Sequence, residues 1–298
     1  STHCISSAAS DVYKRQLDSM FKKNRTKFKS IFYGFDGKKQ PLPDNDSVQD
    51  VLKRINKDGD FDIVKVDTKQ RKRQPQPPFT TSTMQQTANT QLKFRTRKTM
   101  MAAQQLYEGI NLGKGLGQVG LITYMRTDST RISSVAKNAA AQFIHDTWGE
   151  EYSQHKPVQG KLQEGAQDAH EAIRPSDVNR TPESIKDKLT PDQFKLYSLI
   201  WSRFVASQMT PEILDTMAVT IEQNGVIFRA NGSKTNFEGF TKAYPTAKKK
   251  DNVLPSLSEG DKVSLANTDP EQHFTLPPAR YSEAVSYTHL TLPTICSV

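Results

Sequence analysis

The hydrophobic pattern along the chain changes twice, and each change predicts a different kind of structure. Polar and apolar residues alternate from Lys27 to Phe35, as in a strand, and Asp36-Gly37 follows as a hairpin turn. From 79 to 210 apolar residues recur at helical intervals. After Pro211 the alternation returns, with Asn224-Gly225 as a second hairpin turn. This order indicates an α+β fold in which a helical domain is inserted into a β-rich one.

The first β part is expected to hold a helix as well as strands. Its apolar positions 48, 51, 52 and 55 share one helical face, and the pattern stops near Gly59. Residues 61–66 predict another strand. The basic, proline-rich stretch 67–78 follows it, and we predict that this stretch is a connector between domains.

The helical part is expected to start with two helices and a short strand. Residues 82–92 and 98–109 predict the helices, with Gly109 closing the second, and residues 119–125 predict the strand. A third helix is expected at 134–148. The residues predicted to form its buried stripe are Ile132, Val135, Ala139, Phe143 and Trp148.

A fourth helix is expected directly after Thr190. Pro191 suits the first helical position, and Gln193 completes a capping box with Thr190. Beyond the second hairpin, residues 237–244 and 261–269 predict further strands, so the chain ends as it begins, in β structure.

The charge of the chain favours one class of partner. Its 298 residues carry a formal net charge of +9, with a pI of about 9.4, which is typical of proteins that bind nucleic acid. The chain has no run of about 18 apolar residues and no signal-peptide pattern, so we expect no membrane contact and a cytoplasmic location. Cys4 and Cys296 form no CxxC motif and predict no zinc site.

The two ends of the chain share no pattern with the rest. Residues 1–16 and 285–298 lack helix caps and turn signals, and we expect both to be extraneous tails. The segment between them is expected to be an internal fragment of a longer protein.

Tyr124 and Arg126 are the most suggestive pair of residues in the chain. Alternate residues of a strand project to one side, so these two would share a face while Met125 points away. A tyrosine hydroxyl can attack phosphorus and hold a covalent phosphodiester, and a guanidinium suits a phosphate. The residues that follow are expected at a helix N-terminus, which favours an anion: Asp128, Ser129 and Thr130.

A histidine and an arginine form a second candidate pair. His170 and Arg174 are four residues apart, which places them on one face of a helical turn and suits phosphate binding and proton transfer. Each candidate pair also has a structural interpretation. Tyr124 could be an ordinary strand residue, and Arg174 could belong to a helix cap with a solvated salt bridge.

Basic clusters offer candidate DNA contacts. The cluster between the first two predicted helices ranks first because we expect it close to the candidate site, and its phosphate contacts would make binding salt-dependent. The alternative interpretation of such a cluster is a solvated surface without a DNA contact. The residues of this cluster are Lys93, Arg95, Arg97 and Lys98.

Taken together, these stretches resemble one enzyme family. Residues 120–133 ("GLITYMRTDSTRIS") resemble the active-site signature of type IA DNA topoisomerases, the bacterial topoisomerase I family. Residues 167–176 ("QDAHEAIRPS") resemble its second signature, at the expected distance. Further stretches that resemble the family in order are 77–94, 97–109, 198–211 and 273–284.

The resemblance implies a role for each candidate residue. Tyr124 would be the nucleophile that forms a 5′-phosphotyrosyl link with one DNA strand, and Arg126 would hold the scissile phosphate. His170 matches a histidine implicated in DNA binding and proton transfer. The residues that would order the site are Arg174, Asp128 and Thr130.

The resemblance also implies a fold and a substrate. The family fold is a toroid of four domains. By that resemblance, residues 78–210 form the helical domain that carries the tyrosine, 17–77 and 211–275 form two parts of a β-rich arch, and 276–284 begin a DNA-binding domain. A monomeric enzyme, cytoplasmic and associated with the nucleoid, would relax negatively supercoiled DNA that has a single-stranded stretch.

The family's cofactor is the point where this sequence departs from the pattern. The family uses no ATP, and its Mg²⁺ is bound by an acidic cluster in an N-terminal domain. No DxDxE motif appears in this sequence, so we expect no metal ligands in this chain. We therefore expect that the chain alone does not relax supercoils.

Two other interpretations remain open. The chain could be a basic module that binds single-stranded DNA and whose tyrosine is structural. It could also be a different tyrosine enzyme, such as a recombinase or a rolling-circle nuclease. The presence of a covalent adduct separates the first interpretation from the enzyme, and the polarity of the DNA link separates the second.

Overall fold

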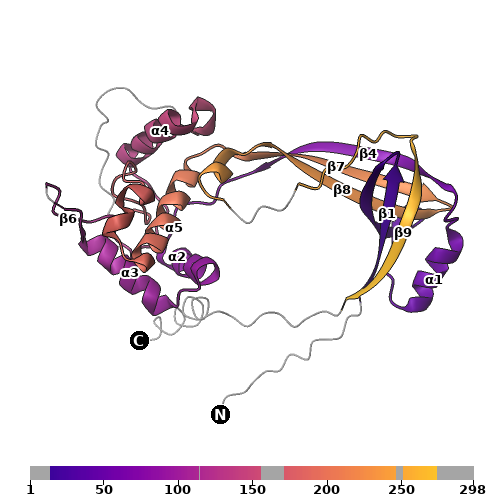
Figure 1. Cartoon of the computed structure of the whole chain (residues 1–298), viewed down its shortest axis with the longest axis horizontal. Coiled ribbons are helices and arrows are strands. Elements are labelled where there is room, and N and C mark those ends of the chain that lie inside the picture. The colour runs from indigo at the N-terminus through magenta and orange to yellow at the C-terminus, as the bar shows by residue number, and fades with distance from the viewer. Residues whose placement is uncertain (1–13, 114, 156–170, 246–250, 274–298) are drawn as a thin grey trace, which may run out of the picture. The chain divides into compact units, whose positions relative to one another are not determined.

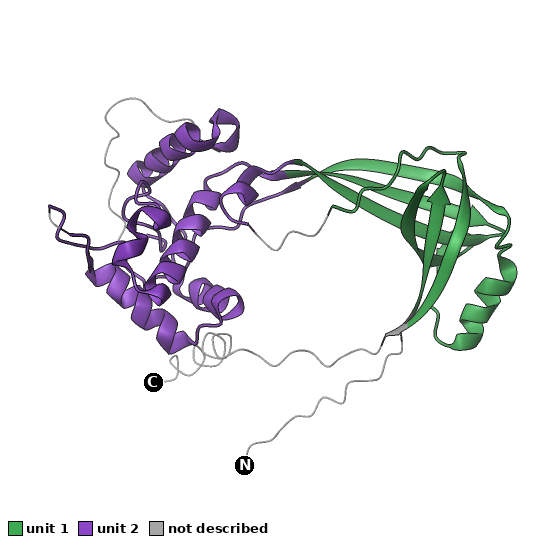
Figure 2. Cartoon of the chain, in the orientation of Figure 1, with its two compact units in different colours: residues 1–71, 213–236, 249–279 green, residues 72–212, 237–248, 280–298 purple. Residues whose placement is uncertain are grey.

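The computed structural model describes residues 14–113, 115–155, 171–245 and 251–273 (Figure 1). The chain divides into two compact units, shown in Figure 2. Unit 1 is β-rich, and its described residues are 14–71, 213–236 and 251–273. Unit 2 is mainly helical, and its described residues come from 72–212 and 237–245.

Unit 1 is built on one seven-stranded sheet. The strand order is β1-β9-β4-β7-β8-β2-β3, and β1 also pairs with β2, so the sheet closes on itself. The predicted helix is α1 (Asn45–Arg54), and its cap is Asp44, whose side chain accepts the Ser47 N–H. The strands are β1 (Lys14–Lys23), β2 (Thr26–Phe35), β3 (Lys38–Lys39), β4 (Asp60–Arg73), β7 (Glu212–Gln223), β8 (Val226–Phe237) and β9 (Lys262–His273).

Three phenylalanines form the centre of the unit 1 core. Phe21, Phe61 and Phe228 are fully buried and come from three different strands. The ring of Phe21 meets Phe61 edge to face at 4.9 Å between centroids and Phe228 at 5.4 Å. Such pairs contribute about 0.5–1.5 kcal/mol each beyond the burial of their area.

Both predicted hairpin turns are confirmed. Asp36 and Gly37 have φ values of 47° and 78°, and Asn224 and Gly225 have φ values of 51° and 75°. Two successive positive φ angles match the right-handed twist of the paired strands, which is why Asp-Gly and Asn-Gly suit these positions.

Two predictions for unit 1 are wrong. Residues 14–16 are not outside the fold, because they pair with residues 271–273 of β9 through the backbone, which needs no apolar alternation. The basic stretch 67–73 is not an irregular connector, because β4 continues to Arg73. The Lys69 carbonyl accepts the Thr216 hydroxyl at 2.8 Å, and Arg73 pairs with Glu212 at 2.7 Å. The remaining tail residues, 1–13 and 285–298, lie outside the described residues.

Unit 2 packs its helices around α5 (Pro191–Ser207). The predicted capping box at its start is confirmed, since Thr190 and Gln193 exchange hydrogen bonds. The other helical segments are α2 (Thr81–Thr87), the π-helical turn η1 (Ala88–Leu92), α3 (Thr96–Glu108), α4 (Ser134–Trp148), η2 (Glu150–Tyr152), η3 (Pro182–Lys188) and η4 (Gly239–Lys242).

Two predictions for unit 2 are only partly right. Of the stripe predicted for the third helix, Ile132, Phe143 and Trp148 are partly buried against the core, whereas Val135 is 55% exposed. The buried face of α4 consists of Ala136, Ala140, Ala141 and Ile144. Small alanines allow close packing, so the helix turns this face inward and leaves the larger Val135 outside. The strand predicted at 237–244 is the end of β8 followed by the short helix η4.

Arg203 of α5 contacts two segments that are far apart in sequence, residues 76–79 and the segment with Tyr244. It thereby connects both segments to the central helix of unit 2. Its guanidinium donates to the Pro77 carbonyl at 2.7 Å and to the Gln76 side chain, and lies over the rings of Phe79 and Tyr244. Arg203 is only 6% exposed, and burial lowers its pKa from the ordinary value. No helix among the described residues is long and apolar enough to cross a membrane.

We predict that Arg203→Met lowers the free energy of unfolding of unit 2 by about 2 kcal/mol, because a part-buried hydrogen bond from a charged donor to the Pro77 carbonyl is lost. Urea titration followed by tryptophan fluorescence reports the change, since Trp201 lies in this unit. Arg97→Met, at an exposed position of α3, is the matched control. Equal unfolding curves for the two variants would contradict the anchoring role.

Candidate active site

The segment that carries Tyr124 is irregular. The strand predicted at 119–125 is wrong, because β6 covers only Gln118–Val119 and pairs with β5 (Ile110–Asn111). Ile122 adds one isolated bridge to Pro175. A Cβ at Gly120 would lie 2.7 Å from the Tyr107 carbonyl oxygen, so the chain passes too close to α3 for a regular sheet edge.

Backbone hydrogen bonds from this segment go to two different parts of unit 2. The Leu121 N–H donates to the Leu106 carbonyl of α3 at 2.7 Å. The Thr123 N–H donates to the Arg174 carbonyl at 2.9 Å, and the Ser176 N–H donates to the Leu121 carbonyl at 2.9 Å. These bonds hold the irregular backbone in place although it forms no regular strand.

Two threonine hydroxyls hold the segment on either side of Tyr124. The Thr123 hydroxyl donates to the Ala172 carbonyl at 2.7 Å and accepts the Arg174 N–H at 3.0 Å. The Thr81 hydroxyl donates to the Met125 carbonyl at 2.8 Å and accepts the Thr127 N–H at 2.8 Å. Residues 123–127 are therefore fixed at both ends.

Burial alternates along this fixed segment as it would along a strand. Met125 and Thr127 are buried, whereas Tyr124 is 42% exposed and Arg126 is exposed. The bonds of Thr81 and Thr123 and the burial of Met125 thus leave the Tyr124 phenol and the Arg126 guanidinium exposed to solvent, two residues apart. That combination can offer a nucleophile and a phosphate ligand to an incoming strand.

The helix N-terminus expected at Asp128 lies further along the chain. The helix α4 begins at Ser134, and the Ser133 hydroxyl accepts the Ala136 N–H at 3.3 Å. Residues 128–132 form local turns instead, in which hydroxyls accept nearby N–H groups, and they compete with a helix for those donors. Asp128 and Thr130 are exposed, and Ser129 is half-buried.

Arg174 lies in an extended segment and not on the predicted helical turn. Its guanidinium donates to Glu171 and to the Pro175 carbonyl, so its charge is used within the protein. His170 lies outside the described residues. Arg174 therefore orders the segment to which Thr123 is bound.

Glu171 connects this segment to α4, a role that the sequence analysis missed. Its carboxylate accepts the Ser133 N–H at 2.8 Å and pairs with Arg174. Burial by itself raises the pKa of Glu171, but the Ser133 hydrogen bonds and the charge of Arg174 outweigh it, so its pKa lies below the ordinary 4.5. The sequence signal that could have indicated this role is the position of Glu171 directly after the candidate His170.

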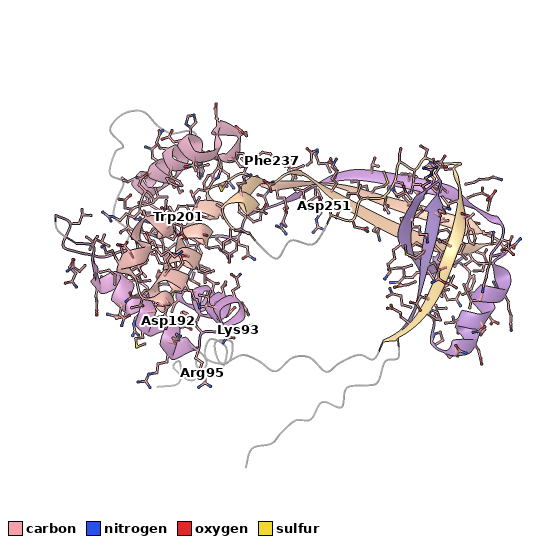
Figure 3. All side chains as sticks on the ribbon, in the orientation of Figure 1. Lys93, Arg95, Asp192, Trp201, Phe237 and Asp251 are labelled. Atoms are coloured by element: carbon pink, nitrogen blue, oxygen red, sulfur yellow. The ribbon has the colours of Figure 1, made fainter. Side chains whose placement is uncertain are left out.

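The basic cluster is separated from Tyr124 by the length of α3. Tyr124 contacts Tyr107 near the C-terminal end of that helix, whereas Arg95 and Arg97 lie at its start. A helix rises about 1.5 Å per residue, so the eleven residues from the start of α3 at Thr96 to Tyr107 correspond to roughly 16 Å along the helix axis. Lys93 bonds to the Thr90 carbonyl and Lys98 pairs with Asp192 at 2.8 Å. Figure 3 labels Lys93, Arg95 and Asp192 in this part of unit 2. The expected proximity of this cluster to the site is therefore wrong.

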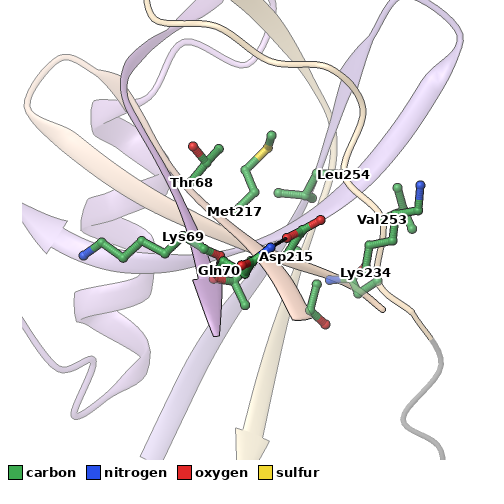
Figure 4. Close-up of a pocket in the computed structure, with 12 residues that line it drawn as sticks. Thr68, Lys69, Gln70, Asp215, Met217, Lys234, Val253 and Leu254 are labelled. Atoms are coloured by element: carbon green, nitrogen blue, oxygen red, sulfur yellow. Dashed lines mark hydrogen bonds between the residues drawn. The ribbon is translucent and has the colours of Figure 1, made fainter. Parts of the chain in front are cut away.

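A hollow of about 370 Å³ lies in unit 1 (Figure 4), whereas Tyr124 belongs to unit 2. Residues of β4, β7 and β8 and residues 252–254 line it. Its carboxylate, Asp215, already accepts hydrogen bonds from Gln70 at 3.2 Å and from Asn236 at 2.8 Å. The hollow shows no convergent set of reactive groups.

The described residues do not fit a magnesium ion. No group of three His, Cys, Asp or Glu side chains among them could hold a metal. In the candidate site, Glu171 is already paired with Arg174, which leaves the exposed Asp128 as a lone carboxylate. We therefore assign no metal step to these residues.

We predict that Thr81→Val speeds hydrogen exchange of the Thr127 amide by about tenfold, because that N–H loses its acceptor. Amide exchange followed by NMR measures the rate. Thr87→Val is the matched control, since it replaces a half-buried threonine of the same helix. An unchanged Thr127 rate would show that the hydroxyl does not hold the segment.

We predict that Glu171 stabilises the protein in a pH-dependent way. Because its folded pKa is lowered, its contribution is complete above about pH 4.5 and is lost as the pH falls through the lowered value. Glu171→Gln should cost about 1 kcal/mol at neutral pH and less in acid. Thermal unfolding from pH 7 to pH 3 tests this, with the exposed Glu183→Gln as control. A cost that is constant with pH would contradict it.

Comparisons with known proteins agree with the resemblance seen in the sequence. A sequence model of the DNA topoisomerase family matches residues 14–285. The chain is also similar in structure to full-length topoisomerase I from Thermotoga maritima, with a TM-score of 0.75 and 32% sequence identity. That match covers 94% of this chain and 44% of the Thermotoga chain, so this chain spans less than half the length of the solved enzyme.

Proposed function

We propose, on the premise that this chain belongs to the bacterial DNA topoisomerase family, that Tyr124 is the nucleophile of a type IA topoisomerase reaction. The observation that carries the proposal is the exposure of Tyr124 and Arg126 on a segment whose backbone is fixed at both ends. A fixed backbone lowers the entropy lost when a reactive group meets its target. The family uses Mg²⁺ and no ATP.

The reaction that we propose exchanges one phosphodiester for another. The Tyr124 hydroxyl loses its proton and attacks the scissile phosphorus, and the bond from phosphorus to the 3′ oxygen breaks. The 3′ oxygen takes up a proton and leaves as a free hydroxyl on the upstream fragment, while the downstream fragment stays bound to Tyr124 through its 5′ phosphate. Arg126 neutralises the negative charge of the phosphate oxygens. Reversal of these steps rejoins the strand, so the bond energy is retained and no nucleotide is consumed.

The division of the chain into two units supports the wider role. We propose that residues 78–210 form the helical domain that carries the tyrosine, and that 17–77 and 211–275 form two parts of an arch. In a toroid of this kind, a second strand passes through the gap while the first is held covalently. His170 would bind DNA and transfer protons, and Lys93, Arg95, Arg97 and Lys98 would bind the phosphate backbone away from the reaction.

We predict that Tyr124→Phe abolishes covalent attachment to DNA and leaves DNA binding unchanged. Residues 14–285 replace the matching part of the Thermotoga enzyme, and the chimera is incubated with end-labelled single-stranded DNA and Mg²⁺ and then denatured. An adduct joined through the 5′ phosphate is expected, and it should be lost in Tyr124→Phe. Tyr152→Phe, whose ring packs on Phe237, is the matched control.

Two outcomes contradict the proposal. DNA binding without any adduct would favour a basic module that binds single-stranded DNA. An adduct through the 3′ phosphate would favour a tyrosine recombinase type of reaction.

A further inference from the structure

We infer that Tyr107 is a positioning residue for Tyr124, and that its ring fixes the direction in which the reactive phenol points. The inference rests on the proposed nucleophilic role of Tyr124. The rings of Tyr107 and Tyr124 meet edge to face, with centroids 5.4 Å apart and planes at 66°.

Among the described residues, this contact is the one ring contact of the Tyr124 side chain. Thr123, Thr81 and the burial of Met125 fix the backbone on either side, but they do not set the two side-chain torsions of Tyr124. Among the described residues, the hydroxyls of Tyr107 and Tyr124 have no hydrogen-bond partner. The direction of the Tyr124 phenol therefore depends on its contact with the neighbouring ring.

Tyr107 is well placed to provide a rigid support. It follows the fully buried Leu106, whose carbonyl accepts the Leu121 N–H at 2.7 Å. The Tyr107 carbonyl lies so close to Gly120 that any side chain there would collide with it. The end of α3 and the start of the Tyr124 segment are thus joined directly, so the backbone positions from which the two rings extend are fixed relative to each other.

The exposure of both rings argues against a purely structural contact. Tyr107 is 40% exposed and Tyr124 is 42% exposed, so neither ring is a core residue of the unit. An edge-to-face pair at the surface adds little to the core but restricts a side chain that must meet a phosphate in one orientation. The support comes from the ring of Tyr107, so its hydroxyl is dispensable.

The first test is made on the chain itself. In the NMR spectrum, the Tyr124 ring signals are identified by their loss in Tyr124→Phe. Tyr107→Phe, which retains a ring, should leave the Tyr124 ring shifts close to those of the original chain. Tyr107→Leu should move them towards free tyrosine while the melting temperature of the chain, followed by circular dichroism, stays similar. Unchanged Tyr124 shifts in Tyr107→Leu would overturn the inference.

The second test measures the reaction in the chimera with the Thermotoga enzyme. Tyr107→Leu should slow adduct formation by about tenfold at saturating DNA, with an unchanged dissociation constant for DNA, and Tyr107→Phe should restore the rate. If Tyr107→Leu reacts as fast as the original sequence, Tyr107 does not position Tyr124 and the proposed function stands. If the original sequence itself forms no adduct, the proposed function falls and this inference falls with it.

Discussion

The candidate site depends on how an irregular backbone is held without a strand or helix of its own. Residues 121–127 form hydrogen bonds to α3, to the segment 172–176 and to Thr81 at the start of α2. A buried N–H or C=O without a partner costs free energy, so these bonds select one path for the chain. On that path Met125 is buried, and the side chains of Tyr124 and Arg126 remain in solvent.

Unit 2 provides the rigid surroundings that such a path requires. Arg203 binds the incoming chain at Pro77 and lies over Phe79, and the Phe79 carbonyl in turn accepts the Ile173 N–H at 2.8 Å. The segment that holds Thr123 is therefore linked to the central helix α5 through two contacts. Positioning of the phenol and stability of the unit are consequences of the same interactions, and Tyr107 extends this support to the Tyr124 ring.

Local sequence rules predicted the elements whose cause is local. The Asn224-Gly225 turn and the capping box of Thr190 and Gln193 follow from a few neighbouring residues, and both are confirmed. The strand predicted at 119–125 is wrong because its backbone bonds to the helix α3 and to the irregular segment around Arg174, and not to a neighbouring strand. Similarly, the basic residues before Arg73 resemble a connector, but pairing with a strand about 140 residues later keeps them in β4.

The residues of the candidate site also fall into two groups, those that the sequence predicts and those that only the structure reveals. Tyr124 and Arg126 could be recognised because a tyrosine and an arginine two residues apart have a clear chemistry. Thr81 and Glu171 could not, because a threonine at a helix start and an exposed-looking glutamate have many ordinary uses. Their importance comes from which backbone groups they meet in the folded unit.

The account is tested most directly by locating the DNA on the protein chain. The denatured adduct of the chimera is digested with nuclease and trypsin, and the peptides are analysed by mass spectrometry. Cleavage after Lys98, Lys114 and Arg126 places Tyr107 and Tyr124 in different peptides. The account predicts a residual nucleotide on Tyr124, in the peptide 115–126. A nucleotide on Tyr107, or on any residue outside that peptide, would contradict it.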